Sequence, residues 1–154
     1  MKFQDFPYTR PDMDKLKLEF QGLLKQFEDA MDYSEQERVF VRINELRREF
    51  ESMSQIASIR QTIDTTNSYY EREQEFFDEN LPIYQGLIAD FYKVLVNSRF
   101  RSQLEGKWGT QLFKIAELTL NTFRPEIIED LQVENKLTTE YTKLIASAKI
   151  FFEG

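Results

Sequence analysis

The chain has no histidine and no cysteine among its 154 residues. Without histidine it cannot form a Ser-His-Asp triad or a His-Glu-x-x-His zinc helix, and without cysteine it has no thiolate nucleophile, iron–sulfur cluster or disulfide. A metal ion would have to bind through carboxylate, hydroxyl and carbonyl oxygens, which suit Mg²⁺ or Ca²⁺ better than Zn²⁺. We therefore expect no catalytic residue, no cofactor-binding residue and no metal ligand in this chain.

Basic residues are also outnumbered by acidic ones. The chain has 20 Lys and Arg and 27 Asp and Glu, which gives a formal net charge of −7. Such a charge disfavours nucleic acids and anionic membranes as partners. No apolar run approaches the roughly eighteen residues of a membrane span. Residues 1–11 break into charge and proline before the apolar region of a signal peptide could form. We expect neither a nucleic-acid nor a membrane partner, and a cytoplasmic location.

Glycine and proline number only five and four, so the chain has few breaks and long helices are expected. Ser-x-x-Glu spacings at Ser34 and Ser68 predict capping boxes at two helix starts. Apolar residues recur at helical spacing in five main stretches. These predict helices over 11–33, 34–64, 68–97, 112–123 and 126–148, with a short segment at 98–109.

Pro82 interrupts the apolar pattern of residues 68–97 without shifting its phase. We interpret it as a kink in one long helix, with two separate helices as the alternative. About thirty residues would extend roughly 45 Å at 1.5 Å per residue, whereas a compact globule of this length measures about 40 Å across. The expected fold class is therefore all-α: an elongated antiparallel bundle of about five helices with a kinked long helix and a short extended tail at 149–154.

Two heptad seams, over residues 39–57 and 77–95, are typical of helices packed lengthwise on one another. The first seam, if continued, reaches Arg60 and Asp64. One interpretation keeps this pair at the edge of the core, while a second apolar stripe of Ile56, Ile59 and Ile63 takes over the packing. The other places the pair on the wall of a cleft completed by another domain.

Five residues are our candidates for a channel-facing or interface-facing surface: Arg60, Asp64, Tyr69, Tyr70 and Trp108. Packing is the alternative role for the two tyrosines. Trp108 fits either a core anchor or an interdomain contact.

Acidic residues that are neighbours in a helix do not converge on one substrate, so we interpret the acidic clusters as solvated faces. A carboxylate-based Mg²⁺ hydrolase would instead need several acids that converge from different helices. The polar middle of the last helix fits a solvated face, or a polar cavity if other parts of the protein cover it. The clusters are Glu71/Glu73/Glu75, Asp78-Glu79 and Glu129-Asp130, and the polar middle is Glu134, Asn135, Thr138 and Thr139.

Several strings, in this order, resemble the N-terminal region of bacterial oligoendopeptidase F-type zinc peptidases, and together they cover nearly the whole chain. They are Phe6-Pro7-Tyr8 with Arg10-Pro11-Asp12, Ala57–Thr65, Glu75–Asn80 with Pro82, Asn97-Ser98-x-Phe100-Arg101, Lys107-Trp108-Gly109, Glu126–Leu131 and Tyr141–Ile150. The resemblance implies a larger, mostly helical peptidase related to thimet oligopeptidases. In that family the zinc lies on a downstream His-Glu-x-x-His helix, the motif glutamate is the general base, and a deep channel admits only short peptides.

We therefore expect residues 1–154 to be a single helical N-terminal domain, a truncated part of a larger zinc metalloendopeptidase. Residues 149–154 would begin the segment that leads into the missing remainder. The helices would form one wall and part of the lid of the peptide channel. The partners would be the rest of the peptidase and, in the full enzyme, short peptides. Zinc would belong to the parent, and the chain alone would be inactive.

The alternative is a free-standing helical interaction module of the coiled-coil type. Such a protein buries its seams within one chain or a symmetric dimer. A domain cut from an enzyme instead exposes an apolar patch, or covers it by self-association through exposed seams.

Overall fold

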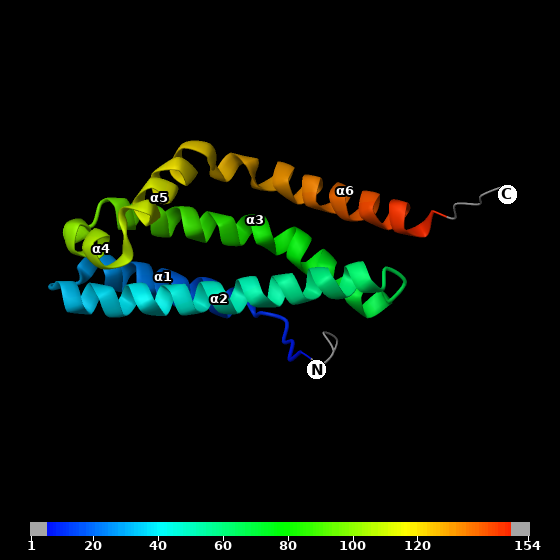
Figure 1. Cartoon of the computed structure of the whole chain (residues 1–154), viewed down its shortest axis with the longest axis horizontal. Helices are drawn as coiled ribbons and strands as arrows, with labels where there is room; N and C mark the ends of the chain where they lie inside the picture. Colours follow the sequence, from blue (N-terminus) through cyan, green and yellow to red (C-terminus); the bar gives the residue numbers. More distant parts are fainter. Residues whose placement is uncertain (1–5, 149–154) are drawn as a thin grey trace.

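The computed structural model describes residues 6–148, and it is 85% helical with no strand in that range. The elongated all-α bundle expected from the sequence is confirmed (Figure 1). The extended tail expected at 149–154 lies outside the described residues. The helices are α1 (Met13–Asp29), α2 (Tyr33–Ile63), α3 (Ser68–Val96), α4 (Arg101–Trp108), α5 (Thr110–Thr122) and α6 (Ile128–Ser147), with a 3₁₀ turn, η2 (Pro125–Ile127), before α6.

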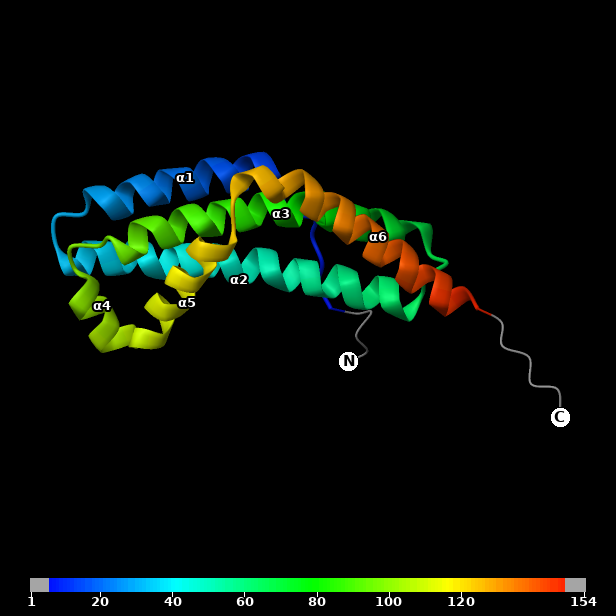
Figure 2. The same ribbon diagram turned by 90° about the horizontal axis from the view of Figure 1, so that it is seen from above.

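Helices α1, α2 and α3 lie side by side along the length of the bundle, and each runs antiparallel to the one before it (Figures 1 and 2). Helices α5 and α6 both pack on α3, while α4 lies at one end of the bundle. Helix α6 crosses α3 obliquely when the molecule is seen from above (Figure 2). The last two long helices therefore form a second layer over the first three.

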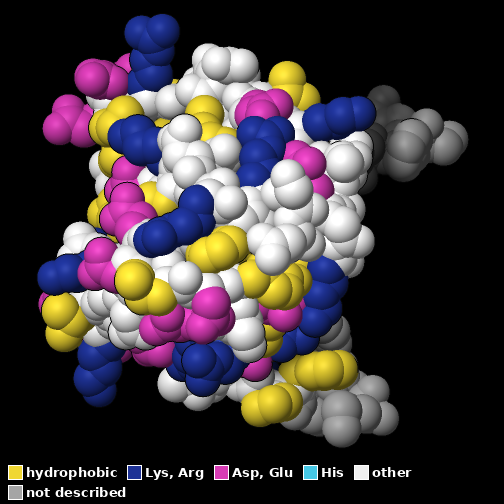
Figure 3. All heavy atoms as spheres, turned by 90° about the vertical axis from the view of Figure 1, so that its left-hand side faces the viewer, with side chains coloured by type: hydrophobic (Ala, Val, Ile, Leu, Met, Phe, Trp, Pro, Cys, Tyr) yellow, Lys and Arg dark blue, Asp and Glu magenta, His cyan; other side chains and the backbone are white. Residues whose placement is uncertain are grey.

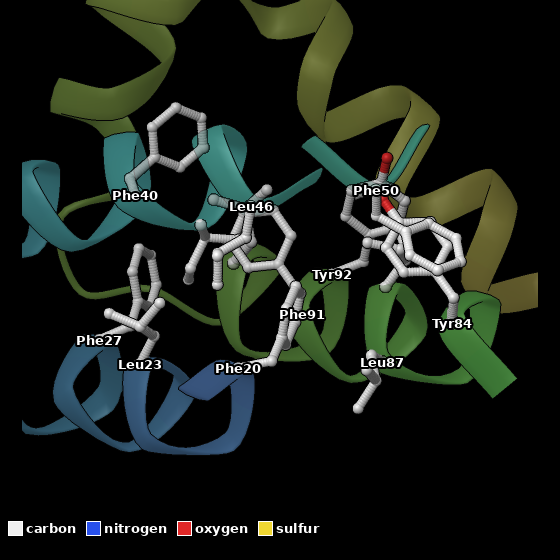
Figure 4. Packing of buried hydrophobic residues seen from close by; sticks show 14 of the residues in the cluster. Phe20, Leu23, Phe27, Phe40, Leu46, Phe50, Tyr84, Leu87, Phe91 and Tyr92 are labelled. Carbon is white, nitrogen blue, oxygen red and sulfur yellow. The ribbon is translucent and has the colours of Figure 1, made fainter. Parts of the chain in front are cut away.

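The core between α1, α2 and α3 is built largely from aromatic rings (Figure 4). Phe91 meets Phe27 edge to face with ring centroids 6.1 Å apart, and it meets Phe40 at 6.0 Å. Phe50 stacks on Tyr84 at 4.2 Å. Most apolar positions of the two predicted seams are buried in this core, so neither seam is left exposed for pairing with another chain: Val39, Ile43, Leu46, Phe50 and Ala57, then Phe77, Tyr84, Ile88, Phe91 and Leu95.

The helix starts differ from the two capping boxes expected at serine. Asp32 caps α2, because its carboxylate accepts from the Glu35 main-chain N–H at 2.9 Å. Asn67 caps α3 by accepting from the N–H groups of Tyr69 and Tyr70. The expectation of Ser34 and Ser68 as caps was therefore wrong. Asp and Asn cap at least as well as Ser, and here each precedes the serine in the chain.

Pro82 lies inside α3, so a single long helix is confirmed. The ribbon of α3 changes direction part-way along its length (Figure 1). A proline inside a helix has no N–H to donate to the carbonyl four residues earlier, and its ring crowds that carbonyl. The main-chain oxygen of Asp78 consequently needs a donor from elsewhere.

The second stripe expected on α2 does not take over the core. Ile59 is 39% exposed and Ile63 is 67% exposed. Gln61, only 4% exposed, instead follows Ala57 on the buried face. The physical reason is that α2 faces a polar groove in its last turns, and an amide side chain fits that surface better than a branched aliphatic one.

No helix within residues 6–148 combines the length and the apolar character that a membrane crossing requires.

Candidate functional site

A polar groove of about 270 Å³ lies between α2, α3 and α6. Ser58 and Gln61 of α2 form one side, Gln74 and Asp78 of α3 form the floor, and α6 supplies several polar side chains opposite. Those from α6 are Asn135, Thr138, Thr139 and Thr142. Three of the four residues of the polar middle, Asn135, Thr138 and Thr139, therefore line a groove that α2 and α3 of the same chain complete. Glu134 is exposed and lies outside it.

Asp78 is the ionisable group at the centre of this groove and is only 5% exposed. Gln74 Nε2 donates to Asp78 Oδ1 at 2.7 Å, and Thr139 Oγ1 donates to Asp78 Oδ2 at 2.8 Å. Burial raises the pKa of Asp78 above its ordinary value, and the two hydrogen bonds offset part of that rise. The expectation of a solvated face was wrong for this acid, because α6 packs over it.

Helix α6 supplies hydrogen-bond donors to main-chain carbonyls of α3, including the one that Pro82 leaves without a helical donor. Asn135 Nδ2 donates to the main-chain oxygen of Asp78 at 3.2 Å, the carbonyl that Pro82 leaves without its helical partner. Gln132 Nε2 donates to the next carbonyl, that of Glu79, at 2.7 Å. The carbonyl that Pro82 leaves unpaired and the carbonyl next to it thus both accept hydrogen bonds from side-chain amides of α6, which hold α6 against α3.

Ion pairs add to this attachment along α6. Lys136 pairs with Glu79 at 2.9 Å, and Lys143 pairs with Glu71 near the far end of the groove. At the start of the helix, Leu131 and the preceding Ile127 of η2 help to line a cavity of about 480 Å³. No residue of α6 is fully buried.

The opposite side of α6 carries an apolar surface that faces away from the bundle. We call it the outer stripe, and it consists of five exposed residues: Val133 (57% exposed), Leu137 (59%), Tyr141 (65%), Leu144 (68%) and Ile145 (57%). The usual arrangement of an amphipathic helix is thus reversed, with polar groups inside and apolar groups outside.

The five residues chosen from the sequence do not form one site. Arg60, Asp64, Tyr69 and Tyr70 lie around the α2–α3 turn. The Arg60 guanidinium donates to the Phe6 main-chain oxygen at 2.7 Å and lies over a tyrosine ring near the N-terminus. Their interface-facing role stays a prediction.

Asp64 has partners of its own in that turn. Its carboxylate accepts from the hydroxyl of Thr66 at 2.7 Å and from the Thr66 N–H at 3.1 Å. These hydrogen bonds lower the pKa of Asp64. Tyr69 is 44% exposed, and its ring lies 5.9 Å from that of Tyr70.

Trp108 lies at the other end of the bundle, in α4. Its ring packs on Phe40 at 4.9 Å, and its Nε1 donates to Glu37 at 3.2 Å. Lys and Arg side chains alternate with Asp and Glu over this end of the molecule (Figure 3). The end carries no charged patch of a single sign that would point to a charged ligand.

Residues 3–123 match the family model of the peptidase M3 N-terminal domain. The chain belongs to this family. The resemblance inferred from the sequence strings is therefore confirmed. A search of curated proteins found no match.

Three solved structures are similar to this M3 N-terminal domain over nearly its whole length. Pz peptidase A with an inhibitor is 57% identical over 99% of the chain, with a TM-score of 0.95. A putative oligoendopeptidase F is 52% identical over 100% of the chain, with a TM-score of 0.96. A putative oligoendopeptidase F from Bacillus anthracis is 45% identical over 100% of the chain, with a TM-score of 0.95. The chain spans only 27–28% of the length of these proteins.

The M3 N-terminal domain also holds a buried acid that the sequence patterns missed. Glu73, about one helical turn before the second seam begins at Phe77, is only 6% exposed. Two N–H groups of Arg10 donate to its carboxylate, at 2.8 and 3.0 Å, and the Tyr8 hydroxyl donates to the same carboxylate. Burial alone would raise the pKa of Glu73, but the hydrogen bonds from Arg10 and Tyr8 outweigh it and lower the pKa.

The side chains present do not fit the zinc site that the family implies. Within residues 6–148, no group of three or more potential ligands lies close enough together to hold a metal ion. The chain also has no histidine or cysteine, the side chains that bind zinc most readily.

Proposed function

We propose that the chain is the non-catalytic N-terminal helical domain of an oligoendopeptidase F-type zinc metallopeptidase that hydrolyses short peptides, and that it forms a wall or lid of the substrate channel. One observation carries the proposal. The chain is 45–57% identical to three peptidase chains over almost all of its own length, but it spans only 27–28% of theirs. The remaining length of such a protein would hold the zinc and the catalytic groups.

The architecture of the chain suits a wall. Three long helices with an interlocked aromatic core make a stiff layer, because cores of this kind are closely packed and resist deformation. The second layer, formed by α5 and α6, packs mainly on α3. A cytoplasmic location for the parent stays a prediction.

The alternative of a stand-alone coiled-coil-type module finds less support. Its two seams pack against other helices of the same chain, so they do not offer a surface for a partner helix. The exposed apolar surface is instead on α6, as expected for a domain that belongs to a larger protein.

A domain exchange tests the proposal. This chain replaces the corresponding segment of Pz peptidase A, and the chimera is compared with the chain alone and with Pz peptidase A that lacks the segment. We expect the chimera to hydrolyse short peptides in the presence of Zn²⁺ and to leave an unfolded long substrate such as casein intact. The chain alone should hydrolyse neither substrate.

Two results would refute the proposal. Hydrolysis by purified chain alone would contradict the non-catalytic role. A folded enzyme without the segment that still discriminates short peptides from casein as well as the chimera does would contradict the wall or lid role.

A further inference from the structure

We propose that the outer stripe of α6 is the surface on which the remainder of the full-length polypeptide packs. This inference rests on the proposed function, and it names the surface that joins the domain to the rest of the enzyme. The occupant to which it commits is the part of the parent chain beyond the residues present here.

The exposed apolar residues of α6 share one face of the helix. Successive residues of an α-helix are about 100° apart around its axis. At that spacing the five residues of the outer stripe fall within an arc of about 120°, and the groove-lining residues Asn135, Thr139 and Thr142 are centred on the opposite side. The five exposed residues therefore form one continuous apolar face.

Helix α6 cannot turn this face inward. Rotation would break the hydrogen bonds from Asn135 and Thr139 to Asp78, and the ion pair between Lys136 and Glu79. It would also leave the Asp78 carbonyl and carboxylate buried without donors, which is costly. The outward direction of the stripe is therefore set by contacts within the domain.

The length of the related peptidases identifies the occupant. The solved peptidases are nearly four times as long as this chain, and they contain its whole fold at TM-scores of 0.95–0.96. A single exposed leucine is ordinary, whereas a continuous apolar face of five large side chains marks a contact surface. A longer chain of this family supplies enough additional polypeptide to cover it.

Charge disfavours a second copy of this chain as the occupant. Glu134 and Glu140 are both exposed; at 100° per residue, Glu140 lies about 20° outside the arc of the stripe and Glu134 lies within that arc, near its N-terminal end. Two copies that met through this face would bring these acids together, in addition to the repulsion between chains of net charge −7. We expect the covering surface to be apolar at its centre, with basic side chains at its edge.

Cysteine alkylation tests the inference, and the absence of native cysteine makes each label unique within this domain. The variant Leu137→Cys probes the stripe. Its matched control is Leu18→Cys on α1, because Leu18 is a leucine on another helix that is 74% exposed. Both variants are prepared in the chain alone and in the chimera with Pz peptidase A, and the rate at each site is read by peptide mass spectrometry.

We expect residue 137 to react at least about tenfold more slowly in the chimera than in the chain alone, since burial limits access to local opening. Residue 18 should react at similar rates in both. Equal rates at residue 137 in the two proteins would refute the inference. So would protection that appears only when a substrate peptide is added, because the stripe would then line the channel. Slow reaction in the chain alone, with a doubled solution mass, would assign the stripe to a second copy.

Peptide hydrolysis by the chimera is measured in parallel and separates the two proposals. An active chimera whose residue 137 stays reactive would refute the docking surface and leave the proposed function standing. Protection of residue 137 in a folded but inactive chimera would support the docking surface and count against the proposed function.

A double variant of the chain alone, Leu137→Ser with Leu144→Ser, requires no chimera. We expect its melting temperature to match that of the unchanged chain within about 2 °C, because exposed residues contribute little to stability. A large drop would show that the stripe already packs within this chain or its oligomer, and would refute the inference.

Discussion

The side chain of Asn135 on α6 donates to the main-chain oxygen of Asp78 on α3, across 3.2 Å. This oxygen lacks a helical donor because the residue four positions later is Pro82. A kink in one helix and the attachment of another are thus the same structural feature.

A double-mutant cycle tests that coupling. Asn135→Ala should lower the free energy of unfolding by about 1 kcal/mol, the net contribution of a typical hydrogen bond. In a Pro82→Ala background the same change should have a smaller effect, because the new N–H at position 82 can donate to the Asp78 carbonyl. Urea denaturation followed by far-ultraviolet circular dichroism measures all four proteins. Equal effects of Asn135→Ala in both backgrounds would show that the two residues are not coupled.

Glu73→Gln tests the ion pair that ties the N-terminal segment to α3. The substitution leaves the Arg10 guanidinium facing a neutral amide, and Tyr8 loses its charged acceptor. We expect a loss of about 1–3 kcal/mol, the usual cost of disrupting a buried charge-assisted hydrogen bond. The matched control is Glu75→Gln, an exposed position on the same helix, which should change stability by less than about 0.5 kcal/mol. Equal losses for the two variants would contradict the assigned role of Glu73.

Glu73 also gives the stability of the domain a defined dependence on pH. Its pKa is lowered in the folded state, so its stabilising contribution is present above the ordinary value of 4.5 and is lost as the pH falls through the folded value. Urea titrations between neutral and acidic pH should show this loss in the unchanged chain. The loss should be smaller in Glu73→Gln, which has no carboxyl group to protonate.

Asp78 has the opposite effect on how the stability of the domain depends on pH. Its pKa is raised above 3.8, so the contribution from this group is most favourable below that value and declines as the pH rises through the folded value. Asp78→Asn should therefore retain or increase stability at neutral pH. The Gln74 amide can turn so that its oxygen, now buried without a partner, accepts from the new Asn side chain. A loss of more than about 1 kcal/mol at neutral pH would show that the charge itself holds α6.

Phe91→Ala tests the aromatic core. The Phe91 ring is fully buried and contacts the rings of Phe27, Phe40 and Tyr92. Removing it should cost about 3–5 kcal/mol, because the cavity that it leaves closes only in part. The exposed Leu18→Ala on α1 serves as the control and should change stability by less than about 0.5 kcal/mol. A small effect at Phe91 would mean that the three-helix layer is not the main stabilising core.

Local patterns predicted the helices well. The apolar spacing placed the long helices within a few residues of their observed ends, and the unshifted phase across Pro82 indicated one helix instead of two. The capping residues were less accurate, because Asp32 and Ser34, or Asn67 and Ser68, are close competitors for the same role. The choice between them depends on where the backbone leaves the preceding turn, which spacing alone does not specify.

The candidate site was harder to predict. Glu73 and Asp78 were interpreted as solvated acids, since Asp and Glu are usually exposed. Their burial depends on partners 57 to 65 positions away in the chain, namely Tyr8 for Glu73 and α6 for Asp78. The one available signal for Glu73 was that an acid stands at helical spacing between Tyr70 and Phe77, where the apolar pattern of this helix would place an apolar residue.

The sequence by itself determined which segments are helical, where the two apolar seams run, and that the chain has no imidazole or thiol chemistry. These properties follow from the spacing and the chemical type of residues that are close together in the chain. Only the tertiary structure decided which side of α6 faces inward. The carbonyl freed by Pro82 and the carboxylate of Asp78 require donors, and the polar side of α6 supplies them, so its apolar side is left facing outward.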